Sequence, residues 1–229
     1  MLFITKTNLY SILAELLPAK GIFLEAGAFN GKDTLVLAQH FPQATIHTFE
    51  PLPEIYAELK KNTHSTPSIK TYPIALSDKT GIATFHIADH PKRPGKICQA
   101  GSLLAPQDRL THSPITYPNT TQVPTITLDE WALQNQVPKI DFMWLDLQGH
   151  ELAVLQAAPK VLKTVTALYL ELNFIQAYEG QPCAQELHEW VLNQGFTLKG
   201  TDYQQKPTHF FGNHLYYRAC LLYTSDAAD

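Results

Sequence analysis

Short apolar runs alternate with segments of helical period along most of this chain. Strand-length runs lie near 21–27, 44–51, 68–78, 139–145, 166–174, 196–203 and 209–218. Apolar residues recur every three or four positions near 32–41, 53–62, 128–136, 151–162 and 184–194. This alternation predicts an α/β fold with a mostly parallel sheet and helices on both faces. The closing pair of strands predicts an antiparallel edge.

One stretch breaks this rhythm. Residues 81–89 alternate like an exposed hairpin strand, and 89–123 are rich in Pro, Ser, Thr and Gln with little periodicity. We predict a long loop insertion over 89–123, of the kind that often forms a lid or binding loop, with a disordered insertion as the alternative. The remaining pattern predicts a single domain over 1–219, in which 1–20 form a helical lead-in.

The last ten residues have no pattern of their own. Cys220–Asp229 read like a translated sequencing-library adapter, so we treat 220–229 as an artefact and exclude them from the fold. The chain as given has 21 acidic residues against 17 Lys and Arg, a formal charge of −4. This mild acidic balance, without any basic run, argues against a nucleic-acid partner.

Composition bounds the compartment and the size of the core. A chain of 229 residues that is 45% hydrophobic can bury one core. Its three cysteines are far apart, which favours a reducing, cytoplasmic compartment over a disulfide framework or a zinc site. Charges interrupt the N-terminal apolar stretch, so we expect neither a signal peptide nor a membrane span there.

The first chemistry-bearing stretch is the glycine loop after the first strong strand, Glu25-Ala26-Gly27-Ala28-Phe29-Asn30-Gly31. A loop between a strand and a helix directs backbone N–H groups at an anion. Dinucleotide sites need glycine where Phe29 stands, so that pyrophosphate can touch the backbone. The spacing instead suits a ligand with a carboxylate, which the loop amides could bind, and an ammonium group, which Glu25 could bind. A simple tight turn is the alternative.

Acidic residues also end the next two strands. Glu50 lies 19 residues after Gly31, where a carboxylate can accept hydrogen bonds from both ribose hydroxyls of an adenosine. Ser77 and Asp78 follow the third strand and could reach the adenine amino group. The alternatives are a solvated Glu50 and a turn-forming Asp78.

The fourth strand ends in Asp146, at the sheet edge where open α/β folds bind ligands. Glu151 and His150 follow at the start of the next helix. The two carboxylates could share a proton, a cation or a substrate, and His150 could act as a base. Alternatively, Asp146 and Glu151 cap the helix and His150 is a surface residue.

Taken together, several stretches resemble the FkbM family of S-adenosylmethionine-dependent methyltransferases. The likeness runs from about 21 to 218 and rests on "FLEAGAFNGKDT", "IHTFEPLPEIYAELKKN", "YPIALSDKTGIATFHI", "ITLDEW", "IDFMWLDLQGHELAVLQAA" and "LYLELNF". The chain departs from the family pattern at Trp144 and Gln148, where the family often has Lys and Glu.

The resemblance implies a Rossmann-like class I fold with a seven-stranded sheet. It implies S-adenosylmethionine as cofactor and methyl transfer to a hydroxyl of a sugar, glycan or secondary metabolite. The cofactor residues that we expect are Glu25, Gly27, Ala28, Asn30, Gly31, Glu50, Pro51, Ser77, Asp78 and Asp146.

The leading hypothesis is therefore an O-methyltransferase with a small-molecule or glycan acceptor. Asp146 is the first candidate for the base, helped or replaced by Glu151 or His150. A metal-assisted variant would use Asp146 and Glu151 together, although we assign no metal site. The alternatives from other classes are a nicotinamide-dependent oxidoreductase and a non-catalytic nucleoside-binding protein.

Overall fold

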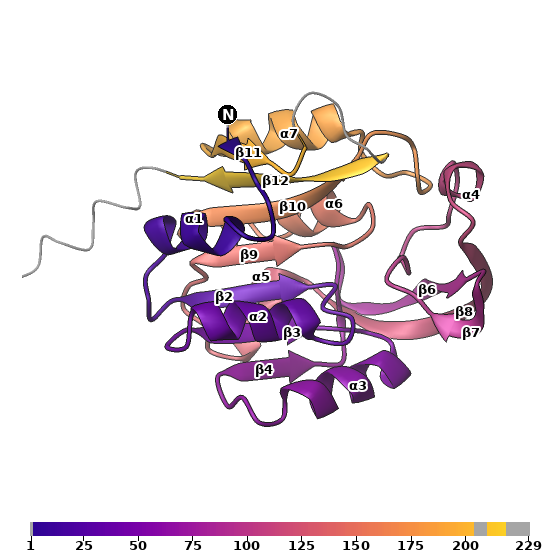
Figure 1. Ribbon diagram of the computed structural model, residues 1–229, viewed down its shortest axis with the longest axis horizontal. Helices are drawn as coiled ribbons and strands as arrows, with labels where there is room; N and C mark the ends of the chain where they lie inside the picture. Colours follow the sequence, from indigo (N-terminus) through magenta and orange to yellow (C-terminus); the bar gives the residue numbers. More distant parts are fainter. Residues whose placement is uncertain (1, 204–209, 219–229) are drawn as a thin grey trace, which may run out of the picture.

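A computed structural model describes residues 2–203 and 210–218 of the chain (Figure 1). Within these ranges the larger sheet contains β1 (Leu2–Phe3), β2 (Ile22–Ala26), β3 (Thr45–Phe49), β4 (Ile69–Tyr72), β9 (Phe142–Leu145), β10 (Ala167–Asn173), β11 (Thr197–Thr201) and β12 (Phe211–Tyr217). Their order across the sheet is β1-β11-β12-β10-β9-β2-β3-β4. The predicted Rossmann-like α/β fold is confirmed, and the two-residue β1 extends the seven expected strands at one edge.

The closing strands differ in detail from the prediction. β12 runs antiparallel to β10 and to β11, and β1 pairs parallel with β11. The antiparallel strand therefore lies inside the sheet, between β10 and β11. The hydrophobic pattern could not place it there, because strands buried on both faces read alike whatever their direction.

Helices cover both faces of this sheet. One face packs on α1 (Leu9–Leu16) and α2 (Lys32–His40), which lie in front of the sheet in Figure 1. The other packs on α5 (Leu128–Gln134), α6 (Glu151–Gln156), the short 3-10 helix η1 (Val161–Thr164) and α7 (Ala184–Asn193). Successive residues serve the two cores in turn: Phe23 and Phe142 face α1 and α2, whereas Leu24 and Met143 face the other helices. α3 (Pro53–Thr63) lies beside β4.

A second, smaller sheet lies beyond the carboxyl ends of the parallel strands (Figure 1). It contains β5 (Ala75–Leu76), β6 (Gly81–His90), β7 (Arg93–Ile97) and β8 (Thr116–Ile126), in the order β5-β8-β6-β7. β5 derives from the run predicted as one strand over 68–78, which leaves the larger sheet after β4. The short helix α4 (Arg109–His112) lies between β7 and β8.

The prediction of a long loop over 89–123 is wrong for much of that segment. β7 and most of β8 lie within it, and β8 pairs antiparallel with β6 along most of its length. Most β8 side chains from Thr116 to Gln122 are exposed or half-buried, and the strand contains two prolines, so it shows neither alternation nor an apolar run. Pairing with β6, not local propensity, makes this segment a strand.

Three other predictions concern the ends and the division of the chain. The segment 220–229 lies outside the described residues. The single-domain assignment over 1–219 stays a prediction. Within the described ranges, no helix is long and apolar enough to cross a membrane.

Candidate active site

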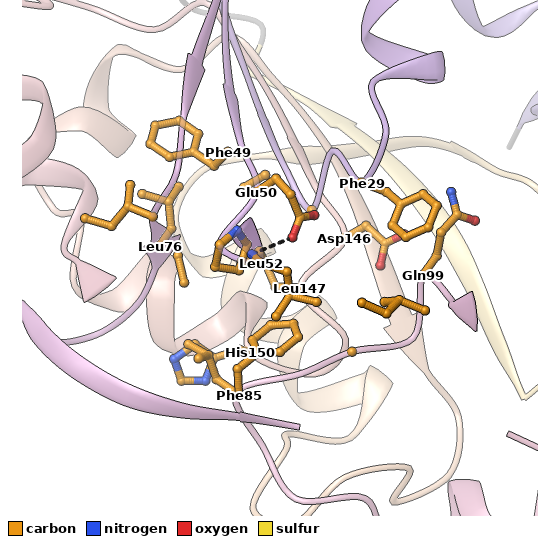
Figure 2. Close-up of a pocket in the computed structure, with 18 of the residues that line it drawn as sticks. Phe29, Phe49, Glu50, Leu52, Leu76, Phe85, Gln99, Asp146, Leu147 and His150 are labelled. Carbon is orange, nitrogen blue, oxygen red and sulfur yellow. Dashed lines mark hydrogen bonds between the residues drawn. The ribbon is translucent and has the colours of Figure 1, made fainter. Parts of the chain in front are cut away.

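A cleft lies between the carboxyl edge of the larger sheet and the second sheet. It has two lobes that share Ala26, Gly27, Cys98, Gln99 and Asp146. The narrow lobe, shown in Figure 2, has a volume of about 60 Å³ and is lined mainly by Phe29, Phe49, Glu50, Leu76, Leu147 and His150. The wide lobe has a volume of about 430 Å³ and includes Glu25, Asp33, Arg109, Gln148, Glu171 and Asp202.

Gly27 allows the ends of two strands to meet at the boundary between the lobes. Its φ is +87°, and a Cβ at this position would lie 2.0 Å from the carbonyl oxygen of Asp146. The Asp146 N–H donates to the carbonyl of Ala26 at 3.0 Å. A side chain at position 27 would therefore separate β2 from β9 and displace Asp146.

Asn30 and Gly31 of the glycine loop make contacts outside the cleft. Asn62 donates its side-chain amide to the Asn30 carbonyl at 2.9 Å, and Gly31, with a φ of +78°, begins α2 in a space that Leu59 closes. Neither Asn30 nor Gly31 is among the described residues that line the cleft. Both were predicted to bind the cofactor, and in the structure both contact α3.

The loop amides are also largely engaged within the protein. Ala28 N–H donates to the Phe49 carbonyl at 3.1 Å, and Gly31 N–H donates to the Ala28 carbonyl at 2.9 Å. The glycine pattern suggested that the loop amides bind a ligand carboxylate. The amides of Ala28 and Gly31 are not free to do so. Ala28 itself lines the wide lobe.

Glu25 is a buried carboxylate at the end of β2. It accepts hydrogen bonds from the hydroxyls of Thr34 and Thr48, and burial raises its pKa to about 7. Its residue lines the wide lobe beside Asp33 and Gly27. A carboxylate held in this way is positioned at the strand end where an ammonium group was expected.

Glu50 ends β3 in the narrow lobe, beside Pro51. Its Oε1 accepts from the Leu52 N–H at 2.9 Å, drawn as a dashed line in Figure 2, and the Phe29 backbone donates a further hydrogen bond. Burial outweighs these bonds and raises the pKa of Glu50 to about 7. The two backbone donors fix the orientation of a carboxylate that retains accepting capacity.

Ser77, Asp78 and His150 form a group of their own. His150 Nε2 lies 3.1 Å from Ser77 Oγ and 3.8 Å from Asp78 Oδ1, and burial lowers the pKa of the imidazole. His150 lines the narrow lobe, on the other side of it from Asp146 in Figure 2, whereas Ser77 and Asp78 are not among its described lining residues. The structure thus joins His150 to the expected adenine-side residues and gives no support to a role as base.

Asp146 stands at the boundary of the two lobes and belongs to a buried polar chain. Gln148 Nε2 donates to Asp146 Oδ1 at 2.6 Å and to Glu171 Oε1 at 2.8 Å. The Tyr178 hydroxyl donates to Gln148 Oε1 at 2.7 Å, which fixes which end of the amide faces the carboxylates. One side-chain amide therefore holds both acids in place.

The two acids differ in their protonation. Burial raises the pKa of Asp146 to about 6, against the hydrogen bond from Gln148 and the positive charge of Arg109, which lower it. Burial and the neighbouring charge of Asp146 raise the pKa of Glu171 well above its usual range. Glu171 therefore keeps its proton to a higher pH than Asp146 does.

Glu151, a predicted catalytic candidate, is held by backbone amides. Its carboxylate accepts from the Leu147 N–H at 2.7 Å and from the Gly149 N–H at 3.1 Å. It is not among the described residues that line the cleft. Glu151 fixes the loop that carries Gln148, and no group of three or more His, Cys, Asp or Glu side chains in 2–203 and 210–218 is arranged to hold a metal ion.

Sequence reasoning missed Glu171 and Arg109. Glu171 lies inside β10, whose other residues are all buried, and a carboxylate in such a strand was itself a signal. Arg109 lies in the segment that was predicted as a long loop. This segment was expected to form part of a binding site. In agreement with that expectation, the wide lobe is lined in part by Cys98, Gln99 and Arg109.

Comparison with curated proteins finds two methyltransferases. The 2-O-methyltransferase NoeI of Sinorhizobium fredii (strain NBRC 101917 / NGR234) is 27% identical over 161 residues, covering 70% of this chain and 66% of NoeI. The hexuronic acid methyltransferase AglP of Haloferax volcanii is 27% identical over 132 residues, covering 57% of this chain and 48% of AglP. The chain thus spans less than two thirds of either relative.

Comparison with solved structures supports the fold. An rRNA methylase from Streptococcus thermophilus has a TM-score of 0.53 at 13% identity, with 95% of this chain and 99% of that chain covered. The N-terminal domain of EvdMO1, solved in the presence of SAH and D-fucose, has a TM-score of 0.52 at 12% identity, with 91% and 80% covered.

The family assignment rests on a match to most of the chain. The model of the methyltransferase FkbM domain matches residues 25–198, from Glu25 at the end of β2 to β11. This range contains the glycine loop, Glu50, Asp146, Gln148 and Glu171. The chain belongs to the FkbM methyltransferase family.

Proposed function

We propose that this protein is an S-adenosylmethionine-dependent methyltransferase that methylates a hydroxyl group of a sugar or glycan. The observation that carries the proposal is the position of Asp146 between two unlike lobes. One lobe is narrow and mostly apolar with a single buried carboxylate, and the other is wide and polar. A cofactor in the first and an acceptor in the second would meet at Asp146.

The lining of the narrow lobe suits a nucleoside. Phe49, Leu76 and Leu147 provide apolar walls for a base, and the fixed carboxylate of Glu50 can accept from two ribose hydroxyls. Glu25 and Gly27 lie where the amino-acid tail would extend. When bound, S-adenosylmethionine supplies an electrophilic sulfonium methyl group.

Asp146 is the base in this proposal. Gln148 holds Oδ1, which leaves Oδ2 to accept the proton of the acceptor hydroxyl. A pKa of about 6 keeps Asp146 ionised at neutral pH while bringing it closer to the working pH than an ordinary aspartate. A positioned base of this kind contributes roughly 10²–10⁴-fold to a rate.

Glu171 and Gln148 are positioning residues. Gln148 can bridge two acids without forcing two carboxylate charges together only while one acid is protonated, and Glu171 is the acid with the more strongly raised pKa. The pair thus orients Asp146 toward the boundary of the lobes. The protein must also align the two reactants, because the acceptor oxygen must approach the methyl group in line at about 3–3.5 Å.

The relatives support the substrate class. One is named as a 2-O-methyltransferase and the other as a hexuronic acid methyltransferase. We also propose a cytoplasmic location, which the wide spacing of the cysteines and the free thiols of Cys98 and Cys183 support.

Two binding experiments and one transfer assay test the proposal. We expect S-adenosylhomocysteine to bind in calorimetry and labelled methyl groups to be transferred to a sugar within an acceptor panel. Fluorescence titration with reduced nicotinamide dinucleotide should show no binding, because Phe29, with a φ of +49°, occupies the position where pyrophosphate sites need glycine. Binding without any transfer would favour the non-catalytic protein, and dinucleotide binding would favour the oxidoreductase.

A further inference from the structure

Arg109 is a buried cation without an ion pair among the described residues. The residue is 6% exposed, and its Nε and Nη1 atoms are buried without a hydrogen-bond partner within 2–203 and 210–218. Arginine stays charged at any pH at which the protein is folded. Burial of such a group is costly unless an anion compensates it.

The backbone holds Arg109 firmly over the wide lobe. Gln107 N–H and Arg109 N–H donate to the Ala177 carbonyl at 2.8 and 3.3 Å, and Asp108 N–H donates to the Gln176 carbonyl at 3.0 Å. The guanidinium carbon lies 5.5 Å from the ring centre of Tyr178 and 5.3 Å from that of Phe210. These rings support the cation, while its Nε and Nη1 atoms remain without a hydrogen-bond partner among the described residues.

The acids of the lobe do not neutralise Arg109 directly. Asp146 and Glu171 are close enough for its charge to lower their pKa values, yet neither forms an ion pair with it within 4.0 Å. Both are held by Gln148 instead. Arg109 therefore lines a polar lobe as a rigid donor without its anion.

We propose that the methyl acceptor carries a carboxylate, bound by the guanidinium of Arg109, in the same lobe as the hydroxyl that Asp146 deprotonates. This inference rests on the proposed function and names its substrate class as acidic sugars. A carboxylate matches the planar fork of arginine with two parallel hydrogen bonds. Asp33, Asp146 and Asp202 also line the lobe, so a monoanion fits better than a phosphate dianion.

The position of Arg109 assigns it to the acceptor and not to the cofactor. It packs on Tyr178 after β10 and on Phe210 before β12, whereas Glu50 and Gly27 follow β3 and β2. β9, which carries Asp146 at its end, lies between these two groups of strands. Glu25, which the proposal gives to the cofactor tail, lines the same lobe but lies on β2, on the other side of β9 from β10 and β12.

Three matched acceptors test the inference on the wild-type protein: methyl glucuronide, its methyl ester and methyl glucoside. We expect kcat/KM to be about 10- to 100-fold higher for the free acid, the usual effect of one charge-assisted pair. Calorimetry on the complex with S-adenosylhomocysteine should show glucuronide binding and much weaker glucoside binding. Equal turnover and equal binding of all three would overturn the inference and leave the proposed function intact.

Variants locate the effect. Arg109→Gln should lose the preference for the free acid, Arg109→Lys should retain part of it, and both should bind S-adenosylhomocysteine within about threefold of wild type. Arg93→Gln, an exposed arginine on β7, is the matched control and should behave as wild type. Arg109→Gln that unfolds normally but loses S-adenosylhomocysteine binding would place Arg109 on the cofactor and overturn the inference. Absence of any binding or transfer by wild type would instead refute the proposed function.

Discussion

The narrow and wide lobes of the cleft are built in different ways. The narrow lobe takes its polar group, Glu50, from the end of a parallel strand and its walls mainly from neighbouring strand ends. The wide lobe collects side chains from Thr5 to Asn213, including Arg109 from α4. Most of the narrow lobe follows from the order of motifs along the chain, and packing adds Phe85 and Leu103 to it, whereas the wide lobe exists only once distant segments have packed together.

The two lobes also treat their acids differently. In the narrow lobe one carboxylate is fixed by backbone donors, as a binding group should be. In the wide lobe a side-chain amide couples two acids, of which one stays ionised at neutral pH. We therefore expect changes in the narrow lobe to alter cofactor affinity and changes at the boundary to alter turnover.

The largest expected effect is on turnover. Asp146→Asn removes the proton acceptor but keeps the shape and a partner for Gln148, so kcat should fall roughly 10²–10⁴-fold. S-adenosylhomocysteine affinity, measured by calorimetry, should stay within about threefold. A loss of kcat below about fivefold would remove Asp146 as the base and leave alignment as the main source of catalysis.

The next effect concerns affinity. Glu50→Ala removes the acceptor of two charge-assisted hydrogen bonds, and S-adenosylhomocysteine should bind roughly 100-fold more weakly in calorimetry. Glu54→Ala, at an exposed position on α3, is the control and should bind normally. Unchanged tight binding by Glu50→Ala would show that the ribose lies elsewhere. It would also contradict the assignment of cofactor binding to the narrow lobe.

The third prediction separates structure from chemistry. Glu151→Ala leaves the N–H groups of Leu147 and Gly149 without their acceptor, which should lower the free energy of unfolding by about 1–3 kcal/mol. Urea unfolding measures this loss, again with Glu54→Ala as the control. At temperatures where the variant is folded, kcat should fall far less than in Asp146→Asn; an equal fall would return Glu151 to the catalytic group.

The smallest effect is the dependence of turnover on pH. The ionised form of Asp146 is the active one, so kcat/KM for the acceptor should fall about tenfold per unit as pH drops below about 6. Between pH 7 and 8 it should be nearly flat. A profile at saturating cofactor measures this, and a limb that persists in Asp146→Asn would assign the titration to another group.

Buried acids should give stability the opposite dependence on pH. Glu25 and Glu50 have pKa values raised to about 7, so the folded state binds more protons than the unfolded state between about pH 4.5 and 7. Their contribution to stability is fully present below pH 4.5 and is lost as pH rises through 7. Urea unfolding of Glu50→Gln, set beside wild type, should show a weaker loss of stability between about pH 4.5 and 7.

The strand–helix order, the family and the residues at the strand ends can be read from the amino-acid order alone. Gly27, Glu50 and Asp146 were found because a parallel sheet brings the carboxyl ends of its strands to one edge. Phe29 likewise argues against pyrophosphate binding from its position in the glycine loop alone. Such inferences succeed where the meaning of a residue depends on its own strand and turn.

Which side chains meet in the site depends on how distant segments pack together. The second sheet arises from pairing of β6 with β8, which local pattern does not encode. Glu151 and His150 look like catalytic groups in the sequence, but backbone amides engage one and Ser77 the other. Arg109 and Glu171 reach the site from distant segments, because a buried charge takes its role from the partners that packing brings to it.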